Sequence, residues 1–471
     1  MRPAYLADTI RAAEEPLLAA LPGVLMQRAA SGLASVLLRE LRALRGAVYG
    51  AQVLLVVGSG NNGGDALYAG ARLLGRGVRV SAWRTSSRVH DAGWAAFVAA
   101  GGRELDAVGA VEALAEVDLV LDGVLGIGGR AGLREPVVLF ARACADAGVP
   151  VVAVDLPSGL DADSPSSVER VETGASAHFT AARSVTFGGL KFCQVLQPAA
   201  AACGTVELID IGLDLPAGDL DCWEVADVAA AWPFPGPTSD KYSRGLVGLD
   251  TGSDAYPGAA VLSTLGAVHA GAGMVRFAGA AGASALIRQA APNVVFGAGR
   301  VQARVLGCGW GDRPDGAAVV ERALADDLPL VLDADALRFL PAGELGERVL
   351  LTPHAGELAR LLQVPRAEIA GDPIGAVRTA SARFGVTVLL KGASQYVCGP
   401  GGRVAIAVPG PPWSAQAGSG DVLAGICGTL LAAGLNPPTA ALAPASSGPA
   451  SIPRAGGPAT PAPRSADPAR R

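Results

Sequence analysis

The segment GSGNNGGD, residues 58–65, directly follows the apolar run VLLVV and combines glycines with oxygen-bearing side chains. Its glycines have the G-x-G-x-x-G spacing of a dinucleotide-binding loop. A nicotinamide-binding Rossmann site also needs an acidic residue about 20 positions later to hold the ribose, but Arg84 and Thr85 follow the next apolar run. We therefore predict that the loop provides oxygen ligands for a cation and hydrogen bonds to a polar ligand, from Asn61, Asn62 and Asp65.

Other apolar runs also end in polar side chains. Standing alone, the glycine loop could be explained by tight packing between a strand and a helix. However, Asp122 ends DLVLD, and Asp155 and Ser158 lie in DLPSGLD after VVAV. In the second half, Asp333, His354 and Lys391 follow apolar runs, and Asp421 lies at the start of the last clear helix. Because ligands of open α/β sheets bind at the carboxyl ends of the strands, we predict one site in each half.

The segment AGSGDVLAG has the features of a phosphoryl-transfer site. It places small residues where a loop opens into a helix, so backbone N–H groups form an anion hole at Gly418, Ser419 and Gly420. Asp421 would be the base for the attacking hydroxyl. The alternative is that Asp421 only caps its own helix. A P-loop is excluded, because the sequence contains no GxxxxGK[ST] motif.

The elements that would position these residues alternate along the chain. A helical pattern over residues 9–41 precedes short apolar runs separated by helix-like stretches, which predicts parallel α/β sheets. Proline and glycine cluster at residues 232–240, and the alternation then begins again. We therefore predict two α/β domains, residues 1–231 and 241–435, joined by a linker at 232–240.

The last residues, 436–471, differ in composition. They contain nine prolines in thirty-six residues and no apolar periodicity. This composition predicts a disordered tail that contributes nothing to a core.

Composition excludes several classes of protein. A net charge of -5 and a pI near 5.5 provide no electrostatic footprint for nucleic acid. No apolar run approaches the roughly 20 residues that cross a bilayer, and the N-terminus does not resemble a signal peptide, so we expect no membrane association and a cytoplasmic protein. The seven cysteines include no CxxC pair, which predicts buried thiols without zinc or disulfides.

The first ~230 residues resemble the YjeF N-terminal family of NAD(P)H-hydrate epimerases, on the basis of NNGGD at 61–65, DGVLGIG at 122–128 and DLPSG at 155–159. The resemblance implies a Rossmann-like three-layer domain and a potassium ion bound by Asn62, Asp122 and Ser158. It implies that Asp155 is catalytic and that the substrate is bound by Asn61, Asn62, Gly63, Gly64, Asp65, Gly126, Ile127, Gly128, Gly129, Arg130, Ala131, Gly132 and Asp155. A solvated role for Arg130 is equally open, and Lys191 lies in a family-like segment with no assigned role.

The second half resembles the ribokinase-like superfamily and, within it, the ADP-dependent NAD(P)H-hydrate dehydratases of the YjeF C-terminal family. The supporting segments are KYSRG at 241–245, GSDAYPGAA at 252–260, DADAL at 333–337, TPHAGELARLL at 352–362, KGAS at 391–394 and AGSGDVLAG. The resemblance implies that Asp421 is catalytic and that the hydrate is bound by Ala259, Gly311, His354 and Asp421. It implies a nucleotide site at Lys391, Gly392, Ala393, Ser394, Gln395 and Gly420. Asp333 is either a helix N-cap or a residue near the phosphates or magnesium.

Together the two resemblances imply repair of damaged nicotinamide nucleotides. The first domain would epimerise (R)- and (S)-NADHX and NADPHX, and the second would dehydrate the S epimer with ADP and Mg²⁺, releasing AMP and phosphate. The expected partners are these small molecules, and a homo-oligomer is compatible with the sequence, which does not fix the oligomeric state. Which of NADHX and NADPHX is preferred, and whether ADP or ATP is used, are also open.

The chain departs from the family pattern at two places. GCGWG at 307–311 stands where the family usually has G-P-G-x-G, which is a mild change. The proline-rich end replaces further helices, which predicts weakened packing behind the last helix and leaves the dehydratase activity of this chain open.

Three competing functions were weighed against parts of the sequence. A hydrolase triad of Ser158, Asp155 and His178 is disfavoured, because the nucleophile elbow requires G-x-S-x-G. A ribokinase-like kinase for a hydroxymethyl substrate and a non-catalytic binding role for the first half stay open.

Overall fold

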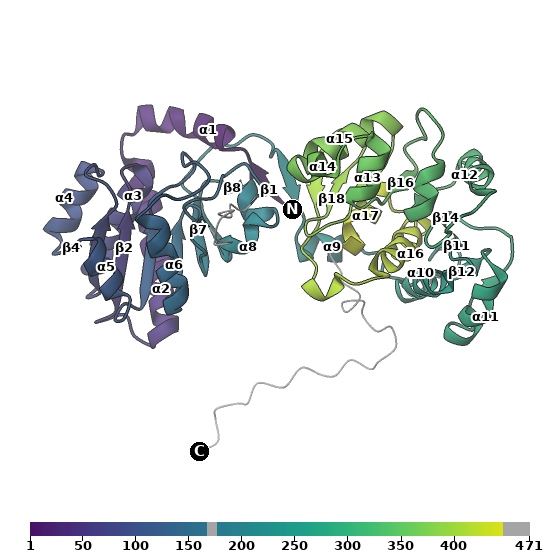
Figure 1. The fold of residues 1–471 in the computed structure, drawn as a ribbon, viewed down its shortest axis with the longest axis horizontal. Helices are drawn as coiled ribbons and strands as arrows, with labels where there is room; N and C mark the ends of the chain where they lie inside the picture. Colours follow the sequence, from purple (N-terminus) through teal and green to yellow (C-terminus); the bar gives the residue numbers. More distant parts are fainter. Residues whose placement is uncertain (167–176, 446–471) are drawn as a thin grey trace, which may run out of the picture. The chain divides into compact units, whose positions relative to one another are not determined.

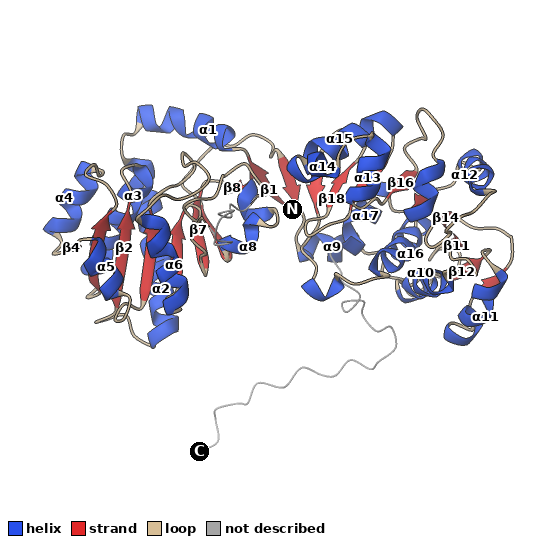
Figure 2. Ribbon diagram, in the orientation of Figure 1, coloured by secondary structure: helices blue, strands red, loops and turns tan. Residues whose placement is uncertain are grey.

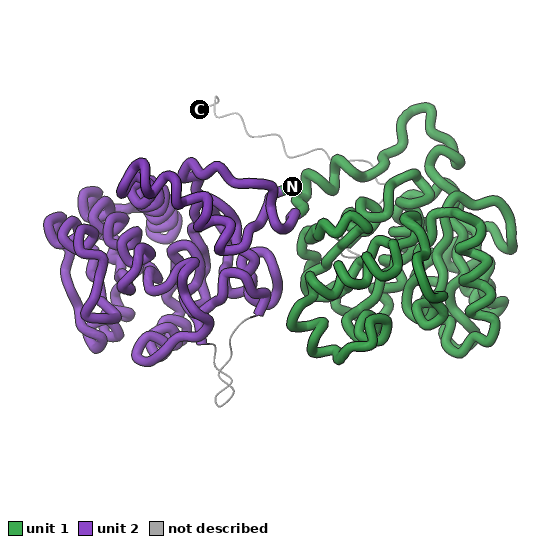
Figure 3. The backbone as a smooth tube through the Cα atoms, turned by 90° about the horizontal axis from the view of Figure 1, so that it is seen from above, with its two compact units in different colours: residues 1, 223–471 green, residues 2–222 purple. Residues whose placement is uncertain are grey.

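The protein consists of two compact units in a computed structural model that describes residues 1–166 and 177–445 (Figure 1). One unit contains Arg2–Cys222, and the other contains Met1 and Trp223–Arg471 (Figure 3). Each unit is built on a largely parallel sheet with helices on it (Figure 2). The predicted α/β class is therefore confirmed.

The sheet of the N-terminal unit has the strand order β4-β3-β2-β5-β6-β7-β9, and every neighbouring pair is parallel. The order of the first five is that of a Rossmann half-sheet, in which the chain starts centrally and crosses over. The crossover places the ends of β2, β5 and β6 side by side. The strands are β2 (Gln52–Val57), β3 (Arg79–Arg84), β4 (Arg103–Leu105), β5 (Leu119–Gly123), β6 (Val151–Val154), β7 (Arg183–Phe187) and β9 (Thr205–Ile209).

Helices cover both faces of this sheet, which gives the three layers that the sequence predicts. One core lies under α2 (Val24–Arg45) and α3 (Asn61–Leu74), and a second lies under α5 (Ala107–Ala113) and α6 (Val137–Ala147). The strands between them are apolar on both sides, as parallel strands require. The remaining elements of this unit are β1 (Arg2–Tyr5), α1 (Ala7–Ala20), α4 (Asp91–Ala99), β8 (Leu190–Lys191), α7 (Phe192–Val195), α8 (Ala199–Cys203) and β10 (Leu220–Cys222).

The C-terminal unit has the strand order β13-β12-β11-β14-β15-β16-β17-β18-β19, parallel from β13 to β17 and antiparallel beyond. The antiparallel hairpin of β18 and β19 was not predicted from the sequence. The strands are β11 (Leu246–Asp250), β12 (Met274–Phe277), β13 (Val295–Phe296), β14 (Ala303–Leu306), β15 (Leu330–Leu332), β16 (Val349–Leu351), β17 (Thr387–Leu390), β18 (Tyr396–Cys398) and β19 (Val404–Ile406).

Two long helices of this unit pack against each other and on the sheet, α10 (Pro257–His269) and α16 (Ser419–Ala432). Glycines on both helices allow the close approach: a Cβ on Gly425 or on Gly266 would clash with the backbone of the facing helix. The other helices are α9 (Val225–Ala231), α11 (Ala281–Ala290), α12 (Gly316–Ala325), η1 (Ala334–Phe339), α13 (Ala355–Leu362), α14 (Arg366–Gly371), α15 (Pro373–Phe384), η2 (Pro412–Ser414) and α17 (Pro437–Ala445).

The boundary between the units lies nine residues before the predicted one. The sequence places the first domain at 1–231, whereas the structure divides the chain between Cys222 and Trp223. Trp223, Val228 and Trp232 pack on the core of the C-terminal unit. The segment was misassigned because its apolar residues are too few to show which core they join.

The predicted tail also begins too early. Residues 437–445 form α17, whose buried residues join the core of the C-terminal unit beside α16. The Asn436 side chain accepts a hydrogen bond from the Thr439 amide (2.9 Å) and so caps the helix, while Pro437 and Pro438 occupy positions where a helix tolerates proline. Proline content therefore misled the sequence analysis. The predicted disorder of residues 446–471 lies outside the described residues.

A charge placed inside α17 tests whether this helix is part of the core. Ala441 is completely buried, so Ala441→Asp should destabilise the C-terminal unit by roughly 3 kcal/mol or more. The urea midpoint for loss of dehydratase activity measures the effect, and epimerase activity of the same chain is the internal reference. Asn436→Asp, which keeps the capping oxygen, should leave the midpoint unchanged. Equal midpoints for the two variants would exclude α17 from the folded core.

Within the described residues, no single helix has both the length and the apolarity needed to cross a membrane. Only α1 and α2 taken as a pair meet these criteria, and they are bent by 114° relative to each other. All seven cysteines are buried, as predicted, and no disulfide is present in the described part of the chain.

Candidate active sites

The first site forms where β2, β5 and β6 end. The Gly58 amide donates to the Gly123 carbonyl (3.1 Å), which joins the loops after β2 and β5. Helix α3 begins at Asn61, so the NNGGD segment is its first turn. A Cβ on Gly126 would lie 2.8 Å from the Asn62 side-chain oxygen, so this loop needs glycine at that position.

Asp122 and Ser158 form a buried pair in this site. The Asp122 carboxylate accepts hydrogen bonds from the Ser158 amide (2.7 Å) and the Ser158 hydroxyl (2.6 Å), and both side chains are completely buried. Burial raises the pKa of Asp122 to about 6, although the hydrogen bonds from Ser158 oppose this shift. The amide nitrogen of the Asn62 side chain, Nδ2, is buried without a hydrogen-bond partner. The predicted cation ligands thus include a buried carboxyl group, whereas the unsatisfied Asn62 Nδ2 is a hydrogen-bond donor and could bind a polar ligand.

Asp155 is held by a buried lysine. Its Oδ1 accepts hydrogen bonds from Lys191 Nζ (2.5 Å) and the Thr186 hydroxyl (3.0 Å), and its Oδ2 accepts one from the Ile127 amide (3.1 Å). Lys191 is 1% exposed and also donates to the Phe187 carbonyl (3.1 Å). Asp155 has a φ of 66°, a left-handed conformation that is rare outside glycine and is concentrated at functional sites. The left-handed conformation of Asp155 at the end of β6 therefore accompanies the hydrogen bonds that hold its carboxylate.

Two further carboxyl groups interact with this pair. Asp65, on α3, is buried, and its Oδ1 has no hydrogen-bond partner. Burial, followed by the charges of Asp155 and Glu14, raises the pKa of Asp65 well above its usual value. Burial and Asp155 also raise the pKa of Glu14, on α1, against the opposing charge of Lys191. Carboxyl groups whose environments differ in this way suit acid and base roles.

The predicted substrate-binding loop from Gly126 to Gly132 lies against Asp155 in the same site. Besides the bond from Ile127 to Asp155, the Gly132 amide donates to the Gly159 carbonyl (2.8 Å), which joins the loops after β5 and β6. Arg130 is exposed on this loop. Arg11 of α1 donates to the Ile127 carbonyl (2.7 Å), so α1 also contributes to the rim.

The hydrolase triad considered from the sequence is not present. The Ser158 hydroxyl bonds to Asp122, and His178 Nδ1 lies 2.8 Å from the Phe179 carbonyl. Asp155 is bound by Lys191 instead. The three residues therefore belong to separate hydrogen-bond networks.

The second site forms where β14, β15 and β17 end against the start of α16. Lys391 Nζ donates to Asp333 Oδ1 (2.6 Å), and Asp333 is 1% exposed. A Cβ on Gly420 would lie 3.3 Å from Lys391 Nζ and 3.9 Å from Asp333 Oδ2. Asp333, Lys391 and Gly420, which come from three distant segments of the sequence, thus lie close together.

Asp421 lies in the first turn of α16 and interacts with this ion pair. Burial raises its pKa to about 6, with a further increase from Asp333 and an opposing effect of Lys391. Burial alone would lower the pKa of Lys391, but Asp333 and Glu357 outweigh it and raise the pKa. Asp421 is therefore poised to take up a proton near neutral pH.

The predicted anion hole at the start of α16 agrees with the structure at two of its three residues. Gly418 has a φ of 87°, which glycine permits, and it begins the turn. The Ser419 amide already donates to the Gln416 carbonyl (3.3 Å). The amides of Gly418, Gly420 and Asp421 have no backbone acceptor among the described hydrogen bonds. The available donors therefore include Gly418 and Gly420 of the predicted set, and Asp421 in place of Ser419.

The His354 side chain makes no described hydrogen bond or ion pair with Asp333, Lys391 or Asp421. It caps α13, since its Nδ1 accepts from the amides of Gly356 (3.0 Å) and Glu357 (3.2 Å), and its side chain is 53% exposed. Its backbone lies beside Lys391 in a parallel bridge. The exposed imidazole is placed on the rim of the site.

The remaining predicted residues lie on two loops. Ala259 contacts the GCGWG loop, because a Cβ on Gly309 would lie 2.5 Å from the Ala259 side chain, and the Gly311 amide donates to Asp335 (2.8 Å). The loop after Lys391 is closed by a bond from the Gln395 side chain to the Gly392 carbonyl (3.1 Å). Ala393 and Ser394 lie between them.

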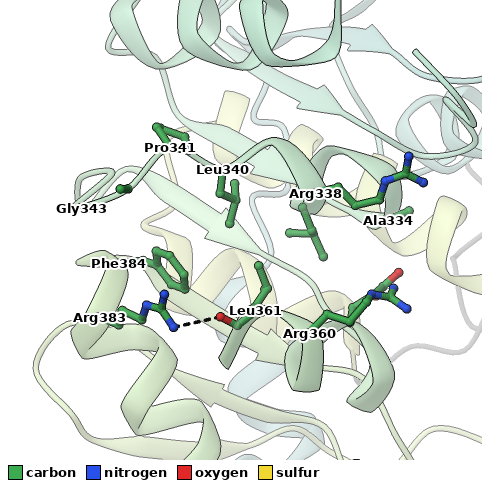
Figure 4. Close-up of a pocket in the computed structure, with 12 residues that line it drawn as sticks. Ala334, Arg338, Leu340, Pro341, Gly343, Arg360, Leu361, Arg383 and Phe384 are labelled. Atoms are coloured by element: carbon green, nitrogen blue, oxygen red, sulfur yellow. Dashed lines mark hydrogen bonds between the residues drawn. The ribbon is translucent and has the colours of Figure 1, made fainter. Parts of the chain in front are cut away.

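A pocket of about 480 Å³ lies beside the second site, between η1, α13 and α15 (Figure 4). It contains none of the predicted site residues. It touches the site only through Ala334, which follows Asp333, and Glu357, which accepts a hydrogen bond from the His354 amide (2.8 Å). The predicted nucleotide residues therefore lie outside this pocket.

Fold and sites together define a two-domain α/β enzyme with one strand-end active site in each domain. The family model described as YjeF-related protein N-terminus matches residues 22–193, and the one described as NAD(P)H-hydrate dehydratase matches residues 247–452. The chain belongs to the family of bifunctional NAD(P)H-hydrate repair enzymes, with an epimerase domain followed by a dehydratase domain. The predicted resemblance is thereby confirmed.

Curated relatives match nearly the whole chain. The bifunctional NAD(P)H-hydrate repair enzyme Nnr of Mycobacterium tuberculosis is 48% identical over 448 residues, covering 92% of this chain and 90% of that protein. The enzyme of the same name from Corynebacterium glutamicum is 35% identical and covers 92% and 87%. Among solved structures, the ADP/ATP-dependent NAD(P)H-hydrate dehydratase of Bacillus subtilis, co-crystallised with ATP/Mg²⁺, is 28% identical, with a TM-score of 0.45, and covers 48% of this chain and 85% of that one.

Proposed function

We propose that the N-terminal unit interconverts the R and S epimers of NADHX and NADPHX, and that the C-terminal unit dehydrates the S epimer. The second reaction consumes ADP and releases AMP and phosphate. One observation supports both assignments above all others: in each unit the predicted catalytic carboxylate lies in a cluster with a lysine, Asp155 with the buried Lys191 and Asp421 with the partly buried Lys391.

Epimerisation at C6 of the hydrated ring needs a base and an acid. Asp155 takes the proton of the C6 hydroxyl, so that the C6–O bond becomes a carbonyl and the N1–C6 bond breaks. The electron pair of that bond goes to N1, which accepts a proton from Asp65. Rotation of the opened chain and closure from the opposite face run the same transfers in reverse. Lys191 holds the charge of Asp155 in place and is a positioning residue.

The residues at the cation site fit potassium. The Asn62 side-chain oxygen lies by the Gly126 loop, and the Asp122 carboxyl is buried without an ion pair in the described residues. Oxygen ligands of this kind suit a hard cation, which would be held by Asn62, Asp122 and Ser158. When bound, potassium would supply positive charge that favours the ionised form of Asp122 and fixes the loops after β5 and β6.

Potassium should stabilise the N-terminal unit more at pH 8 than at pH 5. Because the pKa of Asp122 is raised to about 6, ionisation above that pH costs stability, and a bound cation offsets this cost. The measurement is the thermal unfolding midpoint with and without potassium at the two pH values. In Asp122→Asn, which does not ionise, the pH dependence of the potassium effect should disappear. A potassium effect that is the same in both proteins would place the ion elsewhere.

The dehydratase chemistry uses Asp421 as the base. It removes the proton of the C6 hydroxyl as that oxygen attacks the β-phosphate of ADP, and AMP leaves. Phosphate then departs from C6 as the N1 lone pair moves into the ring, which regenerates the reduced nicotinamide after proton loss from C5. Phosphorylation converts a poor leaving group into a good one, which explains the need for ADP.

The nucleotide is proposed to bind at Lys391 and its loop through Gln395, with Gly420 at the phosphates. Lys391 Nζ and the amides of Gly420 and Asp421 face one point and can neutralise phosphate oxygens. Asp333 provides a carboxylate oxygen of the type that Mg²⁺ binds. When bound, Mg²⁺ would shield the charge on the phosphates. His354 at the rim and Ala259 and Gly311 opposite would contact the hydrate.

The dehydratase should lose activity on the acid side of about pH 6. Asp421 acts when ionised, and its raised pKa means that the base is protonated below that pH. We expect kcat/KM to fall about tenfold per pH unit there, with a plateau above. A pH–rate profile between pH 4.5 and 8 tests this, and a flat profile through pH 5 would rule out Asp421 as the titrating base.

Product analysis tests the proposed function directly. With ADP and hydrated nucleotide, the protein should release inorganic phosphate and form the reduced nicotinamide chromophore in equal amounts. A kinase would instead leave a stable phosphoester and no reduced nicotinamide. Accumulation of such an ester would contradict the dehydratase assignment.

A further inference from the structure

Cys308 introduces a thiol into the dehydratase site. It occupies the second position of GCGWG, the loop after β14, and its side chain is completely buried. Its Sγ lies 3.6 Å from Asp333 Oδ2 and donates to it.

Three potential metal ligands converge here. One ligand atom each from Cys308, Asp333 and Asp421 lies within 4.8 Å of the other two. Metal bonds of about 2.3 Å to sulfur and 2.0–2.2 Å to oxygen place tetrahedral ligands roughly 3.5 Å apart. The distance from Cys308 Sγ to Asp333 Oδ2, 3.6 Å, already matches this spacing, and the Asp421 ligand atom lies within 4.8 Å of both.

The charges at this point balance a divalent ion. Lys391 neutralises one carboxylate through Asp333 Oδ1 and leaves Oδ2 available on the other side. When both carboxyl groups are ionised, one negative charge remains in a buried site. A thiolate would add a second, and a divalent cation would then bring the cluster of Cys308, Asp333, Asp421 and Lys391 to neutrality.

We propose that Cys308, Asp333 and Asp421 form a thiolate-containing site that binds transition-metal divalent cations such as Zn²⁺ and Co²⁺ in the dehydratase unit. Sulfur ligands favour these ions over Mg²⁺, whose preferred ligands are all oxygen. On binding, the S–H proton is released to solvent and the sulfur electron pair forms the metal bond, with no change of oxidation state. Since Asp421 is also the proposed base, the bound ion blocks the dehydratase reaction.

Burial explains why the thiol stays protonated until a metal arrives. Burial, followed by the charges of Asp333 and Asp421, raises the pKa of Cys308 well above its usual value. A protonated thiol is a weak nucleophile and a weak metal ligand, so metal binding at Cys308 is coupled to loss of the thiol proton.

Titration of the full-length protein with Co²⁺, in the absence of nucleotide, tests the site. The expected result is a cobalt–thiolate charge-transfer band that saturates at one ion per chain. Cys308→Ser should abolish the band and weaken binding roughly 100-fold. Cys398→Ser, a buried cysteine on β18 whose Sγ bonds to the Gly399 carbonyl (3.5 Å), is the matched control and should retain the band.

A second variant and an inhibition assay complete the test. If Cys308→Ser disturbs folding, Cys308→Ala replaces it, and circular dichroism shows which variants are folded. Zn²⁺ should inhibit the wild-type dehydratase while leaving the epimerase of the same chain active, and the folded Cys308 variants should resist this inhibition. Absence of the band in the wild-type protein, or its persistence in a folded Cys308 variant, would overturn the proposal. Because binding is measured without substrate, failure here is distinct from failure of the proposed dehydratase function.

Discussion

Replacing Asp421 with asparagine is expected to lower the kcat of the dehydratase about a thousandfold. Asparagine keeps the size of the side chain but cannot accept the hydroxyl proton. The substitution removes one negative charge beside Asp333 but leaves the ion pair between Asp333 and Lys391 in place. Folding should therefore be unaffected. Because the base acts in the chemical step, the KM for the hydrate should change much less than kcat.

The control for this variant is Asp327→Asn. Asp327 has an 83% exposed side chain and a φ of 50°, and asparagine tolerates this left-handed backbone as well as aspartate does. Full dehydratase activity is expected, and both variants should retain epimerase activity. Steady-state kinetics of reduced nicotinamide formation measure both effects. If Asp421→Asn kept a tenth or more of wild-type kcat, another group would have to be the base.

The second large effect is expected at Asp155. Asp155→Asn should abolish measurable epimerisation and destabilise the N-terminal unit by about 3–5 kcal/mol, because Lys191 is left buried without its counter-charge. Asparagine accepts the left-handed φ of 66°, so the loss cannot be assigned to the backbone. Urea unfolding and the exchange of purified epimers measure the two effects separately.

A double variant separates stability from catalysis. Asp155→Asn combined with Lys191→Met removes both charges, and replacing a buried ion pair by neutral side chains is often tolerated. We expect the double variant to regain most of the stability while remaining inactive. Recovery of epimerase activity together with stability would show that Asp155 has only a structural role.

The sequence was sufficient to predict the strand-end residues of both sites. Asn62, Asp122, Asp155 and Lys391 lie at the ends of apolar runs, and a parallel sheet brings such positions together whatever their separation in the chain. Their convergence in the structure follows from that rule, and their individual roles remain proposals. Asp421 was predicted instead from the loop of small residues that opens a helix.

The partners of these residues were not predictable in the same way. Lys191 lies in TFGGLKF, where a lone charge among buried residues was the available signal, but its partner is 36 residues away and the pairing depends on tertiary structure. Glu14 was missed because α1 carries it to the site from outside the sheet. The hydrolase triad failed because proximity along the sequence does not define hydrogen-bond geometry.

Residue composition predicts the C-terminal end of the second unit wrongly. The prolines at the start of α17 suggest disorder, although proline is favourable in the first turn of a helix. The loss of packing predicted after residue 435 is therefore smaller than expected, since α17 covers α16.

The most direct test follows a single purified epimer, (R)-NADHX, with the protein and potassium, by chromatography. Without ADP, both epimers should appear and reach a constant ratio, and no reduced nicotinamide should form. When ADP and Mg²⁺ are added, both should be consumed completely, with AMP, phosphate and NADH produced together. If the R epimer stays unchanged in both conditions, neither strand-end site performs the chemistry assigned to it.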